Sequence, residues 1–380
     1  MQVAANGEIQ VIHAVIHGFE KEQHKKTDLD SIVIKDKGLD VTLPAVNTLV
    51  GGVAKLLGGK MNTQSWGRFE EERGGKFYGA FSKDVHELSK VNTFIELTRK
   101  AMIEIIDHAS EESGSTGSKV LFGHYRDQGG QDRFLVAMIK QKGGITLDED
   151  YVPVDIVEID MSKLSQAADI RCGDFIQIST DEATAAIDGA AKESESEVEL
   201  KNYLSFLVSR DSAEASGYFL KALGCVLNTS PKKSTASVIA VLEDFLESNT
   251  VLAPFVKGAR EAVCRYLQER AEKKQLAKLD EVVHAASSVV PGELKDHLEG
   301  FLQYFNNDLN RVPSEFHVHK GELAKHIKVV IDADDMQLKF NKSVLGTDID
   351  AKVRYDRNAR SLTITNLTQK QLEQLDKQIA

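Results

Sequence analysis

Two apolar runs, Lys-Val-Leu-Phe-Gly-His-Tyr-Arg (119–126) and Arg-Phe-Leu-Val-Ala-Met-Ile-Lys (133–140), carry the clearest structural signal in the sequence. Between them stands Asp-Gln-Gly-Gly-Gln-Asp (127–132). A glycine pair between two apolar runs is typical of a β-hairpin, because glycine readily adopts the backbone angles of tight turns. The sequence therefore predicts two adjacent antiparallel strands here.

The neighbouring segments extend this pattern into an α+β domain. Residues 8–19 are rich in β-branched and apolar side chains and predict a buried strand, and residues 155–160 and 174–179 predict two more. Between the first strand and the hairpin, apolar residues recur at steps of three and four over 85–109, which predicts a helix. We therefore expect a mixed, mostly antiparallel sheet with helices over residues 1–180.

The rest of the chain divides into three further parts. Residues 181–200 hold seven acidic side chains and one lysine, which indicates an acidic linker. Residues 201–319 show helical spacing, beginning with a helix expected over 200–223, so we expect a helical middle region. Short β-like runs separated by polar turns predict a small β-rich subdomain over 320–380; they are residues 327–331, 336–340, 351–355 and 361–365.

Composition sets the broad class of the protein. Of the 380 residues, 42% are hydrophobic and 28% are charged, which is close to the average of globular domains and excludes a mostly disordered or fibrous chain. No run of 18 apolar residues predicts a transmembrane helix, and the N-terminus has no secretory signal pattern. With three cysteines and no CxxC pair, we expect a cytoplasmic protein with reduced, buried thiols.

The charge argues against binding nucleic acid through bulk electrostatics. The chain has 47 Lys and Arg against 58 Asp and Glu, a formal net charge of −11. The acidity is spread evenly, with −6 over residues 1–180 and −5 over 181–380. Phosphate binding requires clustered cations, so only a local basic face would suit such a ligand.

One such local cluster lies in residues 257–278, a stretch that contains seven basic and three acidic side chains. The candidate DNA-binding residues are Lys257, Arg260, Arg265, Arg270, Lys273, Lys274 and Lys278. Positions 270, 274 and 278 are expected to share one face of a helix. A solvated helix face with no ligand is the alternative interpretation. A second basic group, Lys352, Arg354, Arg357 and Arg360, stands in the tail.

Other candidate motifs do not meet the requirements of their chemistry. The stretch Gly51–Lys60 lacks the spacing of a P-loop, because Ala54 stands where glycine is needed and Met61 replaces the hydroxyl residue. His317 and His319 would share a strand face as metal ligands, but no cysteine lies nearby. His124 has no nucleophile motif beside it. We therefore predict no catalytic residue, no metal site and no cofactor.

Several segments in order carry a family resemblance. They are Val-Leu-Phe-Gly-His-Tyr-Arg (120–126), Phe-Leu-Val-Ala-Met (134–138), Asp-Ile-Val-Glu-Ile-Asp (155–160), Asn-Tyr-Leu-Ser-Phe-Leu-Val-Ser-Arg (202–210) and Gly-Tyr-Phe-Leu-Lys-Ala-Leu-Gly (217–224). With the β-rich tail, this order resembles the bacterial nucleoid-associated proteins of the YejK/NdpA type, over about residues 8 to 375. The resemblance implies a bacterial protein of the nucleoid, and by inference one that associates with DNA.

These observations favour one function and leave two alternative functions. We expect a non-enzymatic nucleoid-associated protein that organises the chromosome as a homodimer, contacting the phosphate backbone of double-stranded DNA without sequence specificity. The first alternative is an acidic adaptor that other, DNA-bound nucleoid proteins recruit, which the net charge favours. A nuclease or other hydrolase is the third hypothesis, which metal-dependent DNA cleavage that is lost on mutation of His124 or Asp155 would support. No membrane partner is expected.

Overall fold

The computed structural model describes residues 9–57, 64–70, 76–162, 164, 166–187, 202–208, 213–227, 230–333 and 336–379. The chain forms two compact units, which we describe separately. The first comprises Met1–Thr229 and Leu302–Ser314, and the second comprises Ser230–Phe301 and Glu315–Ala380. A short segment of the first unit is thus inserted between two stretches of the second.

The first unit is built on a seven-stranded sheet in which every pair of neighbouring strands is antiparallel. In spatial order its strands are β1 (Gln10–Phe19), β3 (Ser118–Arg126), β4 (Asp132–Ile139), β7 (Gln166–Arg171), β8 (Leu204–Val208), β2 (Ser65–Phe69) and β9 (Cys225–Leu227). The predicted hairpin is β3–β4, with Gly123 opposite Leu135, so the prediction from residues 119–140 is confirmed.

Helices cover both faces of this sheet, because successive side chains of a strand point to opposite sides. Phe122 and Phe134 lie in a core with aromatic and aliphatic side chains of the helices on one face, whereas Leu121 and Leu135 lie in a second core on the other. The first face carries α2 (Lys76–Asp84), α3 (Val91–Glu111) and α5 (Ala213–Ala222), and the second carries α1 (Pro44–Leu56).

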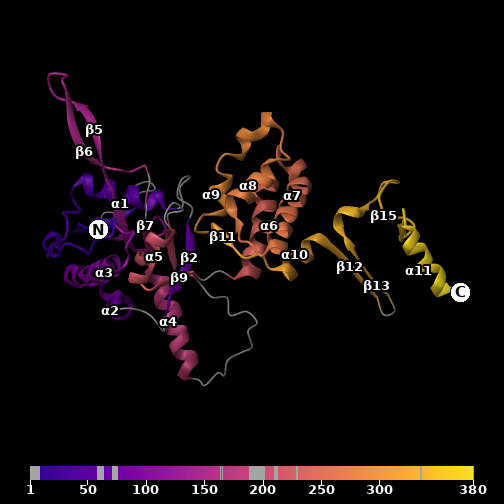
Figure 1. Cartoon of the computed structure of the whole chain (residues 1–380), viewed down its shortest axis with the longest axis horizontal. Coiled ribbons are helices and arrows are strands. Elements are labelled where there is room, and N and C mark those ends of the chain that lie inside the picture. The colour runs from indigo at the N-terminus through magenta and orange to yellow at the C-terminus, as the bar shows by residue number, and fades with distance from the viewer. Residues whose placement is uncertain are drawn as a thin grey trace. The chain divides into compact units, whose positions relative to one another are not determined.

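Two strands extend from this sheet as a separate hairpin, β5 (Gln141–Leu147) and β6 (Pro153–Ile159), which projects beyond the body of the first unit (Figure 1). The strand predicted over 155–160 is part of it. The chain then returns to the sheet as β7 and continues into α4 (Cys172–Ile187).

Two segments of the first unit have a secondary structure that differs from the predicted one. Residues 174–179 were expected as a strand but belong to α4, where the Asp174 carboxylate lies 3.1 Å from Arg171 Nε across one turn. A short apolar run does not distinguish a strand from a buried helix. The helix expected over 200–223 is instead β8 followed by α5, which ends at Ala222 shortly before Gly224 with its positive φ of 67°.

The second unit begins with helices. They are α6 (Pro231–Ser248), α7 (Val256–Lys273), α8 (Leu279–Ser287) and α10 (Lys320–Ile327). Helix α9 (Phe301–Phe305) begins at the last residue before the inserted segment and continues into it. The strands β10 (Ala277–Lys278) and β11 (Glu315–Phe316) form a short antiparallel pair. Ser230 caps α6 by accepting a hydrogen bond from Lys233 N, and Pro231 follows at the first helical position.

Small sheets complete the second unit, as the tail pattern predicted, together with one helix that the pattern did not predict. The strands are β12 (Lys328–Ala333), β13 (Met336–Asn341), β14 (Leu345–Gly346), β15 (Val353–Asp356) and β16 (Ser361–Ile364), and the helix is α11 (Gln369–Ile379). The fold is therefore α+β, with a mostly antiparallel N-terminal sheet, helices in the middle and small sheets near the C-terminus, as expected.

The predicted boundaries at 180, 200 and 319 remain predictions. Residues 188–200 of the expected acidic linker lie outside the described residues, and 181–187 belong to α4. Strands β8 and β9, which come from the stretch assigned to the helical region, pair with β2 and so belong to the first unit. The three cysteines are buried and free, as expected.

Candidate nucleic-acid interface

The basic cluster of residues 257–278 lies on α7 and the segment that follows it. Five of its cations stand on the helix itself, whose apolar side Ala259, Val263 and Leu267 is fully buried. Burial of this side directs most of the charged residues toward solvent. The remaining two, Lys274 and Lys278, follow the end of the helix.

The expectation that positions 270, 274 and 278 share a helical face is wrong. Helix α7 ends at Lys273, and Lys274 adopts a left-handed conformation with φ 55°. The backbone N–H groups of Lys274 and Gln275 both donate to Arg270 O, which closes the helix. Lys278 then lies on the short strand β10. The chain reverses direction before the third of these positions is reached.

Three of the seven cations are already paired with carboxylates. Arg260 Nη1 lies 2.9 Å from Glu243 Oε1, and Lys273 Nζ lies 2.6 Å from Glu269 Oε1. Arg270 donates to Glu281 on α8 at 2.7 Å and lies over the ring of Tyr266. These contacts connect α7 to α6 and α8, and they neutralise part of the local positive charge.

Four of the seven cations are exposed and have no ion-pair partner in the part of the chain that the structure describes. They are Lys257, Arg265, Lys274 and Lys278. The nearby Glu272 accepts a hydrogen bond from Gln268 instead of pairing with one of them. Unpaired, solvated cations can contact phosphate oxygens without first breaking a salt bridge.

The basic group in the tail lies on the hairpin β15–β16 and its turn. Asp356, the acidic residue within this group, accepts hydrogen bonds from the backbone N–H groups of Asn358 and Ala359. Over the described ranges, no carboxylate pairs with the four cations, which are Lys352, Arg354, Arg357 and Arg360. This hairpin therefore presents a second cationic surface of the second unit.

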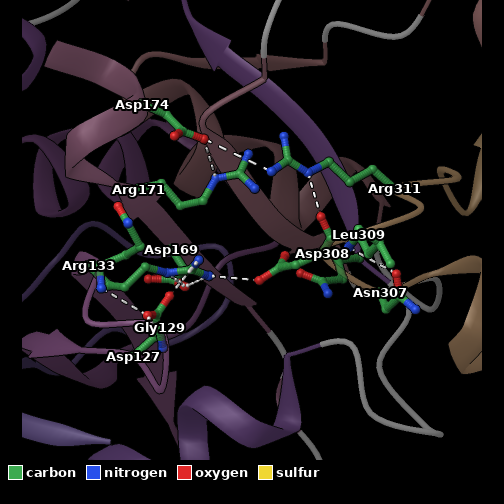
Figure 2. Close-up of polar contacts among 12 residues, drawn as sticks. Asp127, Gly129, Arg133, Asp169, Arg171, Asp174, Asn307, Asp308, Leu309 and Arg311 are labelled. Carbon is green, nitrogen blue, oxygen red and sulfur yellow. Dashed lines mark hydrogen bonds and ion pairs between the residues drawn. The ribbon is translucent and has the colours of Figure 1, made fainter. Parts of the chain in front are cut away.

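A different charged cluster, which the sequence did not indicate, is buried in the first unit (Figure 2). Arg133 on β4 donates through Nε and Nη2 to Asp169 Oδ2 on β7, at 2.9 and 2.5 Å. Tyr125 on β3 donates to the same oxygen at 3.0 Å. Asp169 is only 2% exposed, and its Oδ1 has no partner among the described residues.

The inserted segment Leu302–Ser314 completes this cluster. Asp308 Oδ2 accepts from Arg133 Nη2 at 3.2 Å (Figure 2). Arg311 Nη1 donates to Asn202 O at 3.2 Å. Arg171 Nη2 donates to the same Asn202 carbonyl oxygen. The cluster therefore binds the inserted segment to the sheet.

Burial controls the protonation of this cluster. Burial raises the pKa of the Asp169 carboxyl, and the adjacent Arg133 guanidinium opposes that rise. Burial, together with the nearby charge of Arg311, lowers the pKa of Arg171 to about 10. The charged strand residues of the cluster are Arg133, Asp169 and Arg171. Charged side chains are rarely buried in a strand unless they are paired, so their positions within or beside apolar strands are the sequence signal that could have indicated the cluster.

Two of the three histidines weighed as sites have structural partners, and the third, His317, is exposed. His319 Nδ1 accepts from Glu322 N at the start of α10, and His124 is buried with Nε2 at 3.2 Å from Asp132 Oδ1. Burial lowers the pKa of His124. Among the residues with described positions, no group of three His, Cys, Asp or Glu side chains is arranged to hold a metal ion.

Comparison with known families gives the chain its classification. The model of the family described as nucleoid-associated protein YejK matches residues 15–373. The chain belongs to the YejK family of nucleoid-associated proteins. The resemblance seen in the sequence is thereby confirmed.

Relatives within the YejK family match over nearly their whole length. A nucleoid-associated protein of Metapseudomonas resinovorans is 24% identical over 365 residues, which is 96% of this chain and 98% of the relative. Nucleoid-associated proteins of Pseudomonas paraeruginosa and of Pseudomonas aeruginosa are each 22% identical over 370 residues, which is 97% of this chain and 97% or 98% of the relative. In the described parts of this family member, no helix is both long and apolar enough to span a membrane.

Proposed function

We propose that this nucleoid-associated protein binds double-stranded DNA directly and largely without sequence specificity, through the exposed cations of residues 257–278. The observation that carries this proposal is the lack of any carboxylate partner, among the described residues, for Lys257, Arg265, Lys274 and Lys278. The proposed role is chromosome organisation in the bacterial nucleoid, without a catalytic step.

Direct binding to DNA is compatible with the net charge of −11, because only a local cationic surface has to contact the phosphates. Each phosphate that a Lys or Arg neutralises releases counterions, which is favourable and sequence-independent. The acidic parts of the surface repel DNA, so contact is favoured at the cationic surfaces, first of all at residues 257–278. The paired cations Arg260, Arg270 and Lys273 contribute less, because a phosphate would have to compete with their carboxylates.

We further propose that the protein acts as a homodimer through the β5–β6 hairpin. One face of this hairpin carries Ile145, Leu147 and Val157, which are 56–75% exposed, with Asp155 opposite Ile145. An isolated two-stranded hairpin is marginally stable in water, so an apolar face of this kind gains stability by packing. A second copy of the chain presents the same face, so the two faces can pack against each other across a two-fold axis. Two copies would double the DNA contacts.

The adaptor remains the second candidate function, because the net charge of −11 favours it. An adaptor would reach the nucleoid through DNA-bound proteins, and the β5–β6 hairpin would then bind such a protein.

Fluorescence anisotropy with a labelled duplex of arbitrary sequence separates the two functions. We expect binding at about 50 mM salt that weakens steeply toward 200 mM, with a log–log slope near −3 to −4 if four phosphates are contacted. A second duplex of different sequence should give the same affinity. Absence of binding by the folded protein at the lowest salt would reject direct contact and leave the adaptor.

A further inference from the structure

The hairpin of β15 and β16 in the tail has two unlike faces. Val353 is only 4% exposed, so its side of β15 is the covered one. Lys352 and Arg354 stand at the alternate positions, so they occupy the opposite, outer side. Thr363 lies opposite Arg354 on β16. The outer face of this two-stranded ribbon therefore carries two cations and a hydroxyl group, which are groups that contact the phosphates of nucleic acids.

Two arginines stand at the turn of this hairpin. Asp356 Oδ1 accepts hydrogen bonds of 2.9 Å from the backbone N–H groups of Asn358 and Ala359, which fixes the turn. Arg357 and Arg360 flank these two residues, and both are exposed. Because only an asparagine and an alanine lie between them, the end of the ribbon is narrow and carries two guanidinium groups.

The backbone at Arg360 does not favour an arginine. Its φ of 50° lies in the left-handed region, where glycine and asparagine are preferred to long side chains. In the part of the chain that the structure describes, the Arg360 guanidinium has neither a hydrogen bond nor an ion pair. An arginine kept in a disfavoured conformation without a partner indicates a contact outside the chain.

The carboxylates near the hairpin leave its cations available. Asp348 and Asp350, in the loop before β15, form no ion pair with the four cations over the described ranges. Asp356 has one oxygen engaged with two N–H groups of the turn. Four cations against three carboxylates give the hairpin and this loop a net charge of +1. So small an excess suits insertion at one point of a duplex, because wrapping along it requires many cations.

We propose that the β15–β16 turn inserts Arg357 and Arg360 into the minor groove of DNA where that groove is narrow, as it is in A-tracts. A narrow minor groove has an enhanced negative potential that attracts arginine. The cations of the outer face then lie on the adjacent phosphates. The class of ligand rests on the proposed function, whereas the contact surface is separate from residues 257–278. Because the preference is for groove shape, two duplexes of mixed sequence without an A-tract bind alike.

Fluorescence anisotropy of the full chain with two duplexes of equal length tests the insertion. One duplex contains an A-tract, and the other has a mixed sequence without one. We expect the A-tract duplex to bind about fivefold more tightly. Arg357→Gln with Arg360→Asn should remove this difference, and asparagine preserves the turn because it readily adopts the left-handed backbone. Lys370→Gln with Lys377→Gln on α11 is the control, with the same change in charge, and should retain the difference.

The preference for the A-tract duplex decides whether the arginines are inserted. Circular dichroism verifies that each variant is folded. Equal affinity of the folded wild type for the two duplexes would overturn the proposal, and so would a preference that the arginine variant keeps. Netropsin, a small molecule that occupies the minor groove of A·T tracts, should also abolish the preference. A preference that persists with netropsin bound would place the contact outside the minor groove and overturn the insertion.

A second variant separates this proposal from the contact at residues 257–278. Replacing Lys257, Arg265, Lys274 and Lys278 by Gln should weaken binding to both duplexes alike and leave the A-tract preference intact. Loss of the preference in this variant would assign it to residues 257–278 and overturn the insertion. Unchanged affinity for both duplexes would contradict the proposed function and leave the insertion standing.

Discussion

Arg133 and Asp308 are 175 positions apart in the chain, yet Arg133 Nη2 lies 3.2 Å from Asp308 Oδ2. The same nitrogen lies 2.5 Å from Asp169 Oδ2. Asn306 adds a second attachment, because its side chain accepts from Gln64 N at 2.6 Å. The inserted segment Leu302–Ser314 is thus fixed to the first unit, although both of its neighbours in the chain belong to the second.

The two carboxylates around Arg133 should differ sharply in their contribution to stability. Asp169→Ala removes the buried partner and leaves the Arg133 guanidinium poorly compensated, so we expect a loss of about 3–5 kcal/mol in the free energy of unfolding. Asp308 is 48% exposed at its side chain, so Asp308→Ala should cost at most about 1 kcal/mol. Denaturant unfolding followed by Trp66 fluorescence measures both values for the first unit. Equal losses in the two variants would contradict the assigned difference in burial.

Strand β2, which lies between β8 and the edge strand β9, should not tolerate a side chain at Gly67. A Cβ atom there would overlap with Val226 O on the neighbouring strand β9. We expect Gly67→Ala to lower the free energy of unfolding by about 3 kcal/mol, because the strands must separate to make room. Gly79→Ala on α2 is the control, since a Cβ there meets nothing within 4 Å and should stabilise the helix by about 0.5–1 kcal/mol. A neutral effect at Gly67 would refute the close strand spacing.

The stability of the first unit should fall in mild acid because of His17. Its Nδ1 accepts from Lys35 N, its Nε2 lies 3.1 Å from Thr98 Oγ1, and burial lowers its pKa from 6.5 to about 4. The unfolded chain therefore binds more protons between pH 6.5 and 4. This contribution is fully present above pH 6.5 and is lost as the pH falls, by about 3 kcal/mol at pH 4.

The pH series is read from urea unfolding at intervals between pH 4.5 and 7.5, with the fluorescence of Trp66 as the signal. His17→Gln should be less stable than the wild type at pH 7.5 but should show a shallower loss toward acid pH. Parallel curves for the two proteins would show that His17 does not titrate in this range.

The limits of sequence-based prediction follow from particular elements. The β3–β4 hairpin was predictable because its turn and its two apolar runs are local in the chain. The α4 region was not, because six residues of apolar and polar character fit either period, and only the folded structure shows that Phe175 is buried in the core from a helix. The change from β8 to α5 depends on pairing with β7 and β2, which no local pattern reveals.

The candidate sites, like the elements of the fold, were predictable only where their signal is local in the chain. The cations of 257–278 were visible in the sequence as a local charge excess, but their partners were not, because Glu243 and Glu281 lie on other helices. The buried cluster around Arg133 joins residues separated by 36 and 175 positions. Such contacts depend on the tertiary fold, so sequence analysis found the cations of 257–278 without their partners and did not find the cluster around Arg133.

The apolar face of the β5–β6 hairpin should control self-association. In the proposed dimer, Ile145→Glu with Val157→Glu would place charges in the contact and separate the copies. Sedimentation velocity should give a dimer for the wild type and a monomer for this variant. Lys142→Gln on the opposite face, where the lysine pairs with Glu158, is the control and should remain a dimer. A monomeric wild type at micromolar concentration would exclude this interface.

The most direct test of DNA binding compares two matched sets of substitutions in residues 257–278. The first set replaces the unpaired Lys257, Arg265, Lys274 and Lys278 by Gln, and the second replaces the paired Arg260, Arg270 and Lys273. The measurement is the slope of log affinity against log salt for a duplex. The first set should flatten the slope by roughly 3 to 4 and the second by less than 1. A slope that neither set changes, or that the paired set changes more, would contradict contact through the unpaired cations.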